Sequence, residues 1–198
     1  MAFKIIVCAK QVPDTNVIKI NPKTGTLIRD GVPSILNHDD ANALEEALKI
    51  KDKFVDVTVT VISMGPPQAD VALREALAMG ADEAVLISDR KFGGADTWAT
   101  SSTIAGAIKK LDYDLIVAGR QAIDGDTAQV GPQIAEHLGI PHVSYAASVE
   151  VEDDDTVVIR RNFEDRYHII EAKTPLLITT LGEEIEPRYM SVGGIFDA

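Results

Sequence analysis

The stretch LIVAGRQAIDGDTAQVGPQIAEHL, residues 115–138, passes through three different patterns within a short length of chain. It opens with the apolar run Leu115–Ala118, which predicts a buried strand. A glycine-containing loop follows, and from Thr127 to Leu138 apolar residues recur on one face of a predicted helix. The order strand, loop, helix is the repeating unit of α/β proteins.

The same unit occurs three more times before residue 115. The predicted strands and helices are, in chain order, Phe3–Ala9, Asp40–Lys51, Val55–Met64, Asp70–Met79, Glu83–Ser88 and Asp96–Leu111. Parallel strands in one sheet need crossover connections, which are usually helical. We therefore predict an α/β fold with a largely parallel sheet and helices on both faces.

After Pro141 the pattern changes from alternating strands and helices to strands alone. The strand-like segments are Val143–Val151, Thr156–Arg161, Tyr167–Ala172 and Pro175–Leu181. Acidic turns separate the first three of them, which predicts antiparallel additions at one edge of the sheet. Earlier in the chain, residues 19–29 predict an excursion or hairpin after the first strand.

The C-terminal end, residues 183–198, is half apolar and glycine-rich and carries no pattern for a terminating helix. Such a tail needs another surface to pack on, or it belongs to a longer chain. With no repeat or linker elsewhere, residues 1–198 are predicted to form a single domain.

Composition excludes several classes of partner. The 198 residues carry 19 basic and 31 acidic side chains, and this formal net charge of −12 disfavours attraction to nucleic acid or anionic lipid. No apolar run approaches the roughly 18 residues of a membrane-spanning helix, and the start lacks a signal peptide's long apolar stretch. The single cysteine, Cys8, is expected to be a buried, inert thiol, and its being alone indicates a reducing compartment. We therefore expect a cytoplasmic protein without direct membrane insertion.

Open α/β sheets bind ligands at the carboxyl ends of their strands, where loops enter helices. Among these loops the segment after Ala118 is the most informative, because Gly119, Gly125 and Gly131 would let the backbone turn tightly and approach a ligand. Thr127 is predicted to open a helix whose unpaired N–H groups suit a phosphate. The segment matches neither the Walker loop nor the dinucleotide fingerprint.

Asp124 and Asp126 in this loop allow three interpretations. They could cap the following helix, hydrogen-bond a ribose hydroxyl, or hold a divalent metal, and we favour the first two. The four histidines lack the spacing of a zinc site, so no metal site is predicted. A second loop, Phe92–Thr97, is either closed by an Asp96 cap or faces an anion or flavin.

Several segments together resemble the β subunit of electron-transfer flavoproteins, and the likeness covers the whole chain in order. The most specific segment is GRQAIDGDTAQVGP at 119–132. The others are VCAKQVPDT at 7–15, SILN at 34–37, ALAMGADEA at 76–84 and EPRY at 186–189. The sequences at 92–97 and 130–132 resemble the electron-bifurcating branch of that family. His38 is a departure, since many members have proline there.

The resemblance implies an adenine-nucleotide-binding, Rossmann-like domain that pairs with a larger α subunit. In bifurcating members the β subunit holds the ADP part of an FAD that accepts hydride from NADH, whereas AMP takes that place in simpler members. The cofactor contacts implied on this chain are Cys8, Ala9, Lys10, Asn37, His38, Asp39, Asp40, Met64, Gly65, Asp96, Thr97, Gly119, Arg120, Gln121, Ala122, Ile123, Asp124, Gly125, Asp126, Thr127, Ala128, Gln129 and Val130.

The implied activity is electron transfer from NADH through FAD to the α-subunit flavin and a partner dehydrogenase, of the acyl-CoA or 2-hydroxy-acid type, by electron bifurcation. Residues 183–198 would then be the partner-docking tail of a longer chain, with Tyr189, Val192 and Ile195 as contacts. No catalytic side chain is implied, because flavin redox chemistry belongs to the cofactor. Two alternatives stay open: a non-bifurcating subunit with structural AMP, and a stand-alone nucleotide-binding regulatory domain.

Overall fold

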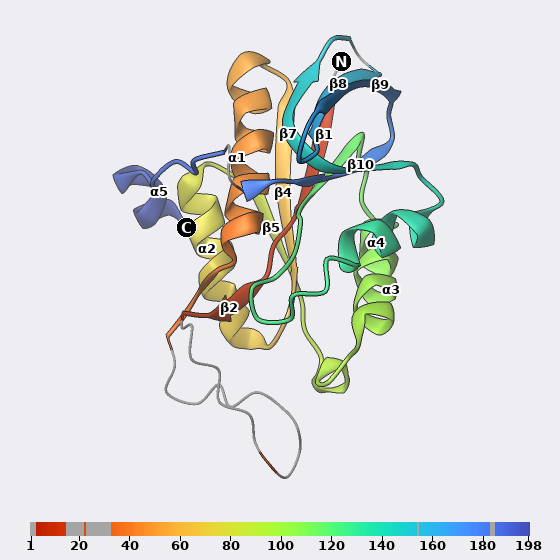
Figure 1. Ribbon diagram of the computed structural model, residues 1–198. Coiled ribbons are helices and arrows are strands. Elements are labelled where there is room, and N and C mark those ends of the chain that lie inside the picture. Colours follow the sequence, from red (N-terminus) through yellow and green to blue (C-terminus); the bar gives the residue numbers. More distant parts are fainter. Residues whose placement is uncertain (1–2, 15–21, 23–32, 154, 183–184) are drawn as a thin grey trace.

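The computed structural model describes residues 3–14, 22, 33–153, 155–182 and 185–198 (Figure 1). An eight-stranded sheet forms its centre, with the strand order β5-β4-β1-β6-β10-β7-β8-β9. Its strands are β1 (Phe3–Cys8), β4 (Val57–Met64), β5 (Glu83–Ile87), β6 (Leu115–Gly119), β7 (His142–Val151), β8 (Thr156–Asn162), β9 (Tyr167–Lys173) and β10 (Leu176–Thr180). In this spatial order, the six strands β5, β4, β1, β6, β10 and β7 run parallel to their neighbours. β8 and β9 add antiparallel strands at one edge. The largely parallel α/β fold is confirmed.

Helices cover both faces of the sheet, with α1 and α2 on one face and α3 and α4 on the other (Figure 1). The helices are α1 (His38–Lys53), α2 (Asp70–Met79), α3 (Thr97–Ile108), α4 (Val130–Leu138) and α5 (Val192–Asp197), with short 3₁₀ turns η1 (Pro67–Ala69) and η2 (Arg90–Phe92). A small antiparallel sheet of β2 (Gln11–Pro13) and β3 (Ser34–Leu36) lies between β1 and α1 in the chain. In the described part of the chain, no helix has both the length and the apolar composition to cross a membrane.

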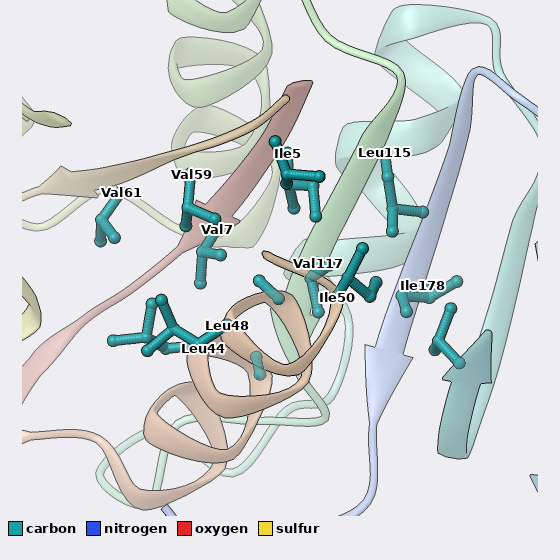
Figure 2. Close-up of a cluster of buried hydrophobic side chains, with 14 of the residues drawn as sticks. Ile5, Val7, Leu44, Leu48, Ile50, Val59, Val61, Leu115, Val117 and Ile178 are labelled. Atoms are coloured by element: carbon teal, nitrogen blue, oxygen red, sulfur yellow. The ribbon is translucent and has the colours of Figure 1, made fainter. Parts of the chain in front are cut away.

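The core follows from the two-residue period of the strands, whose successive side chains point to opposite faces. In β1, Ile5 and Val7 face α1, where they pack with Leu44 and Leu48 (Figure 2). Ile6, between them in sequence, belongs to the second cluster, on the α3 and α4 face. Because both faces are covered, these parallel strands are nearly continuous apolar runs.

Three segments differ from the sequence-based expectation, and a fourth lies outside the described residues. β7 pairs parallel with β10 before it pairs antiparallel with β8. α4 begins at Val130 rather than Thr127. A short helix, α5, ends the chain where none was expected, because the Ser191 side chain caps it by accepting from the Gly194 N–H at 2.9 Å. The excursion expected at 19–29 falls, apart from residue 22, outside the described residues.

The order of the strands creates a topological switch point beside β1. From β1 the chain moves through α1 and α2 to β4 and β5 on one side, and α3 then returns it to β6 on the other side of β1. The carboxyl ends of β1 and β6 therefore lie where the winding direction reverses. This is the place at which open α/β sheets bind ligands.

Two glycines give a matched test of this packing. A Cβ at Gly131, in the first turn of α4, would lie 2.8 Å from Cγ2 of Thr179 in β10, whereas a Cβ at Gly106 in α3 would meet no atom within 4 Å. We expect Gly131→Ala to lower the free energy of unfolding by about 1–3 kcal/mol through overpacking. Gly106→Ala should raise it by about 0.5–1 kcal/mol, because alanine is the better helix former. Urea unfolding of both variants checks this, and an equal response of the two would contradict the close packing of α4 on β10.

Candidate functional site

The candidate site lies where β1 and β6 end side by side. Cys8 and Ala118 are partners in the parallel ladder, so both strands finish at the same edge of the sheet. From this edge the chain continues into Ala9 and Lys10 on one side and into the β6–α4 loop, residues 120–129, on the other. The predicted contacts from β1, α1 and the β6–α4 loop are thus brought together.

Asn37, immediately before α1, connects these segments. Its side chain is fully buried and does not cap α1. Instead, Nδ2 donates to the carbonyl of Gln121 at 2.9 Å, and Oδ1 accepts from the N–H of Ile123 at 3.1 Å. The Asn37 N–H donates to the carbonyl of Lys10 at 2.9 Å. One amide side chain therefore fixes the β6–α4 loop against the start of α1.

Asp40, in the first turn of α1, hydrogen-bonds to the chain at the carboxyl ends of both β1 and β6. One carboxylate oxygen accepts from the N–H of Lys10 at 2.9 Å and the other from the N–H of Gly119 at 3.2 Å. The side chain is buried, and this loss of solvation raises the pKa of Asp40 to about 7. Hydrogen bonds from Asn37, Lys10 and Gly119 lower it, and neighbouring Asp39 raises it further.

Two further side-chain contacts shape the β6–α4 loop. Lys10 Nζ donates to Asp124 Oδ1 at 2.5 Å, and the Asp124 side chain is only 3% exposed. The amide of Gln121 donates to the carboxylate of Asp126. Asp126 and Ala128 both have φ of 52°, a left-handed conformation that is costly for residues with a Cβ. These non-helical residues explain why α4 begins later than its apolar pattern predicts.

The expected N-cap at Asp124 or Asp126 is wrong, because the N-cap residue of α4 is Gln129, whose side chain makes no cap hydrogen bond. The N-terminus of α4 therefore begins directly where the β6–α4 loop ends, without a cap from its own N-cap side chain. An uncapped helix N-terminus combines free donors with the positive end of the helix dipole. The first turn of α1 also lacks a side-chain cap but carries Asp39 and Asp40, whereas the first turn of α4 has no acidic residue, so α4 is the better placed to receive an anion.

The start of α3 lies beside the start of α4. Asp96 caps α3 by accepting from the N–H of Ala99 at 2.8 Å, which confirms the capping interpretation of this residue. The hydroxyl of Thr97 donates to Oε1 of Gln129 at 3.3 Å, and Gln133 Nε2 donates to the same hydroxyl at 3.4 Å. Thr97 is therefore brought into the site through Gln129.

Gln133 is a residue that sequence reasoning missed. It follows Gln129 by four positions, so both amides lie on the same face of α4, and that spacing was available as a signal. Its Oε1 also accepts from the hydroxyl of fully buried Ser101 in α3 at 3.2 Å. The two helix starts are joined by this polar contact.

The glycines of the loop serve different purposes. A Cβ at Gly119 would lie 2.6 Å from the carbonyl carbon of Asp39, so β6 ends directly against the start of α1. A Cβ at Gly125 would meet nothing within 4 Å. Gly119, like Gly131, is thus required by packing inside the protein, whereas Gly125 borders open space.

Four other predicted residues lie around this edge. Met64 ends β4, next to β1, and a Cβ at Gly65 would lie 2.9 Å from that of Ala69, so glycine lets η1 fold back closely. Cys8 is partly buried, and burial, with a contribution from nearby Asp40, raises the pKa of its thiol to about 12. It therefore stays protonated, as expected for an inert thiol. His38 is exposed at the start of α1.

Arg120 and Asp39 form a looser contact. Arg120 Nε lies 3.5 Å from Asp39 Oδ2, and within the described residues both atoms are buried without a hydrogen-bond partner. The backbone N–H of Arg120 donates to the carbonyl of Thr180 at the end of β10. Arg120 is thus directed toward α1 and β10.

Two features lie away from this edge. Tyr189, Val192 and Ile195 belong to the C-terminal segment, whose helix α5 packs on α2 (Figure 1). A cavity of about 410 Å³ lies between the C-terminal half of α1 and β7, lined by Lys49, Phe54 and other residues, none of them predicted for the site. Throughout the described ranges, no three His, Cys, Asp or Glu side chains are grouped to hold a metal ion.

Asp40 gives this site a pH dependence with a definite sign. Its ordinary pKa is 3.8, so between about pH 4 and pH 7 the folded protein holds a proton that the unfolded chain has released. The stability that this proton confers is present below about pH 4 and is lost as the pH rises through about 7. Asp40→Asn removes this titration, so the stability of the wild type relative to the variant should fall by roughly 2–3 kcal/mol between about pH 5 and pH 8. Urea unfolding at both pH values measures it, and a constant difference would contradict the titration.

With the geometry in place, comparison with known proteins identifies the family. The family profile described as "Electron transfer flavoprotein domain" matches residues 24–194. The chain is 67% identical over 196 residues to the electron transfer flavoprotein subunit beta of Clostridium acetobutylicum, covering 99% of this chain and 75% of the relative. It is 63% identical over 197 residues to subunit CarD of the caffeyl-CoA reductase-Etf complex of Acetobacterium woodii, with the same coverage.

A third relative is the acryloyl-CoA reductase electron transfer subunit gamma of Anaerotignum propionicum, 52% identical over 200 residues, which cover 98% of this chain and 74% of the relative. The chain thus spans about three quarters of the length of these relatives. The profile match and the identities extend over nearly all of the residues given. This chain therefore belongs to the electron transfer flavoprotein family, among its β subunits, whose role is electron transfer.

Proposed function

We propose that this chain binds FAD at the joined ends of β1 and β6, takes electrons from NADH through it, and passes them to the flavin of an α subunit and to a partner dehydrogenase by electron bifurcation. The observation that carries the cofactor proposal is the β6–α4 loop. Asn37 and Lys10 hold it in place, it ends at the uncapped N-terminus of α4, and it borders open space at Gly125.

The residues at this edge fit the diphosphate of a dinucleotide. Two cationic side chains at this edge already face carboxylates, Lys10 at Asp124 and Arg120 at Asp39. A chain of net charge −12 therefore has to bind phosphate mainly through backbone N–H groups, and the uncapped start of α4 supplies them.

Bound FAD would supply the redox chemistry, as acceptor of a hydride from NADH. The chain's own residues bind and orient it. Asp40 and Asn37 hold the strand ends and the loop, while Asp96 and Thr97 form the wall where α3 begins beside α4. No proton transfer is assigned to Cys8, since its thiol stays protonated.

The C-terminal segment is the proposed docking surface for the partner dehydrogenase. Tyr189 is 94% exposed, Val192 74% and Ile195 54%. Exposed apolar side chains in such a group are typical of a protein-binding surface. Two of the relatives are named for caffeyl-CoA and acryloyl-CoA reductase complexes, which favours a partner of the acyl-CoA type over a 2-hydroxy-acid dehydrogenase.

A β subunit with structural AMP is the second candidate, because the same loop and helix N-terminus would accept a single phosphate. A stand-alone regulatory domain is less well supported, since the family match extends over residues 24–194.

The cofactor proposal is tested on the heterodimer purified with its α subunit. We expect about two flavins per heterodimer after denaturation, and bleaching of flavin absorbance by NADH without an added reductase. One flavin together with AMP, and no bleaching, would instead support the structural-AMP candidate.

Gly125→Val tests the place of the cofactor. The variant should fold normally because nothing lies within 4 Å of the new Cβ, but its side chain would enter the proposed path of the diphosphate. An obstruction of about 1–3 kcal/mol corresponds to a loss of affinity of roughly 5- to 150-fold. Gly106→Val, also directed into open space but on α3, is the control. Nucleotide titrations of the two should differ; equal affinities would place the cofactor elsewhere.

A further inference from the structure

Arg188 makes the most extensive side-chain contacts of the C-terminal segment. Its Nε and Nη2 donate to the two carboxylate oxygens of Glu45 at 2.8 and 3.0 Å, and its backbone N–H donates to the same carboxylate at 3.0 Å. Nη2 also donates to Asp52 at 2.7 Å and Nη1 to the other oxygen of Asp52 at 3.4 Å. Both carboxylates belong to α1, so the fork spans nearly two turns of that helix.

These contacts are stronger than those of an ordinary surface ion pair. The Glu45 side chain is 8% exposed, and the two-pronged geometry matches the planar guanidinium. The hydrogen bonds that the Arg188 guanidinium donates to Glu45 and Asp52 raise its pKa, so the fork keeps its charge. Loss of Arg188 would leave the buried Glu45 carboxylate without these donors, which is costly.

The chain after Arg188 is anchored a second time, on α2. The N–H of Ser191 donates to the carbonyl of Ala78 at 3.0 Å, and a Cβ at Gly194 would lie 2.5 Å from that carbonyl oxygen. Arg74 of α2 donates to the carbonyl of Ala198. α5 therefore lies flat on α2, at the left of the sheet in Figure 1.

In residues 189–198, which follow the Arg188 anchor on α1 and include the contacts with α2, several apolar side chains are exposed to solvent. Tyr189 and Met190 follow Arg188 directly, and Phe196 of α5 is 84% exposed. A flexible segment with such side chains would have to be ordered on each binding event, and that ordering weakens binding. Here the anchors order the segment in advance.

We propose that Arg188 is a positioning residue for partner docking: its fork on Glu45 and Asp52 fixes the segment that displays Tyr189, Val192 and Phe196 to the partner. The inference rests on the proposed docking of an acyl-CoA-type dehydrogenase on this segment. Arg188 itself contacts α1 and not the partner. It affects docking only by fixing the position of the exposed side chains that follow it in the chain.

The test compares Arg188→Lys with the wild type in the complete heterodimer. Lysine keeps the charge but cannot span both carboxylates with a planar fork. Amide hydrogen exchange of residues 189–198 should accelerate about tenfold or more. With the caffeyl-CoA reductase of Acetobacterium woodii as probe, the KM for the reductase should rise about tenfold, while kcat and flavin content stay at the wild-type level.

Two further variants keep the result interpretable. Glu45→Gln should reproduce the faster exchange, and combining it with Arg188→Lys should add little, since both remove one interaction. Arg166→Ala, which removes an exposed fork on neighbouring Asp165, should leave exchange of 189–198 unchanged.

Wild-type exchange in Arg188→Lys, or faster exchange with an unchanged KM, would overturn the positioning role. If the wild-type heterodimer itself passed no electrons to the reductase, the proposed docking function would fail instead, and the inference with it.

Discussion

The first turn of α1 is tied to the ends of β1 and β6, and the rest of the candidate site depends on that connection. Asp40 accepts the N–H groups of Lys10 and Gly119, while Asn37 holds the β6–α4 loop through its amide. The side chains of Asn37 and Asp40 are buried, and an unmade hydrogen bond at a buried polar group is expensive. The loop therefore cannot move without leaving a buried donor or acceptor unpaired.

This arrangement also explains how an acidic protein can offer a place to a phosphate. Three carboxylates at the edge accept hydrogen bonds from the protein itself, Asp124 from Lys10, Asp126 from Gln121 and Asp40 from two backbone donors. Lys10 compensates the charge of buried Asp124, and the N-terminus of α4 adds the positive end of a helix dipole at the end of the loop. The net charge of the protein affects how readily an anionic ligand approaches over long distances. Local dipoles such as the start of α4 determine whether its phosphate binds.

The fold class was predictable from the sequence, because the continuous apolar runs that form β1, β4, β6 and β10 are typical of parallel strands covered by helices on both faces. The edge that gathers the site followed from the fold class alone. The start of α4 was not predictable, since a helical apolar pattern says nothing about the φ angles of Asp126 and Ala128. Nor was the parallel pairing of β7, because β10 enters between it and β6 from far along the chain. α5 has only six residues, and its Ser191 cap is a local signal too short to outweigh two glycines.

The C-terminal segment and the 92–97 turn lie on opposite faces of the sheet. α5 rests on α2, whereas residues 92–97 lead into α3 on the far side (Figure 1). A macromolecule seated on α5 would leave the approach to α3 uncovered. If NADH approached the cofactor from residues 92–97 while the proposed dehydrogenase docked on α5, the two would not compete for space, and a ternary complex would form in either order of addition.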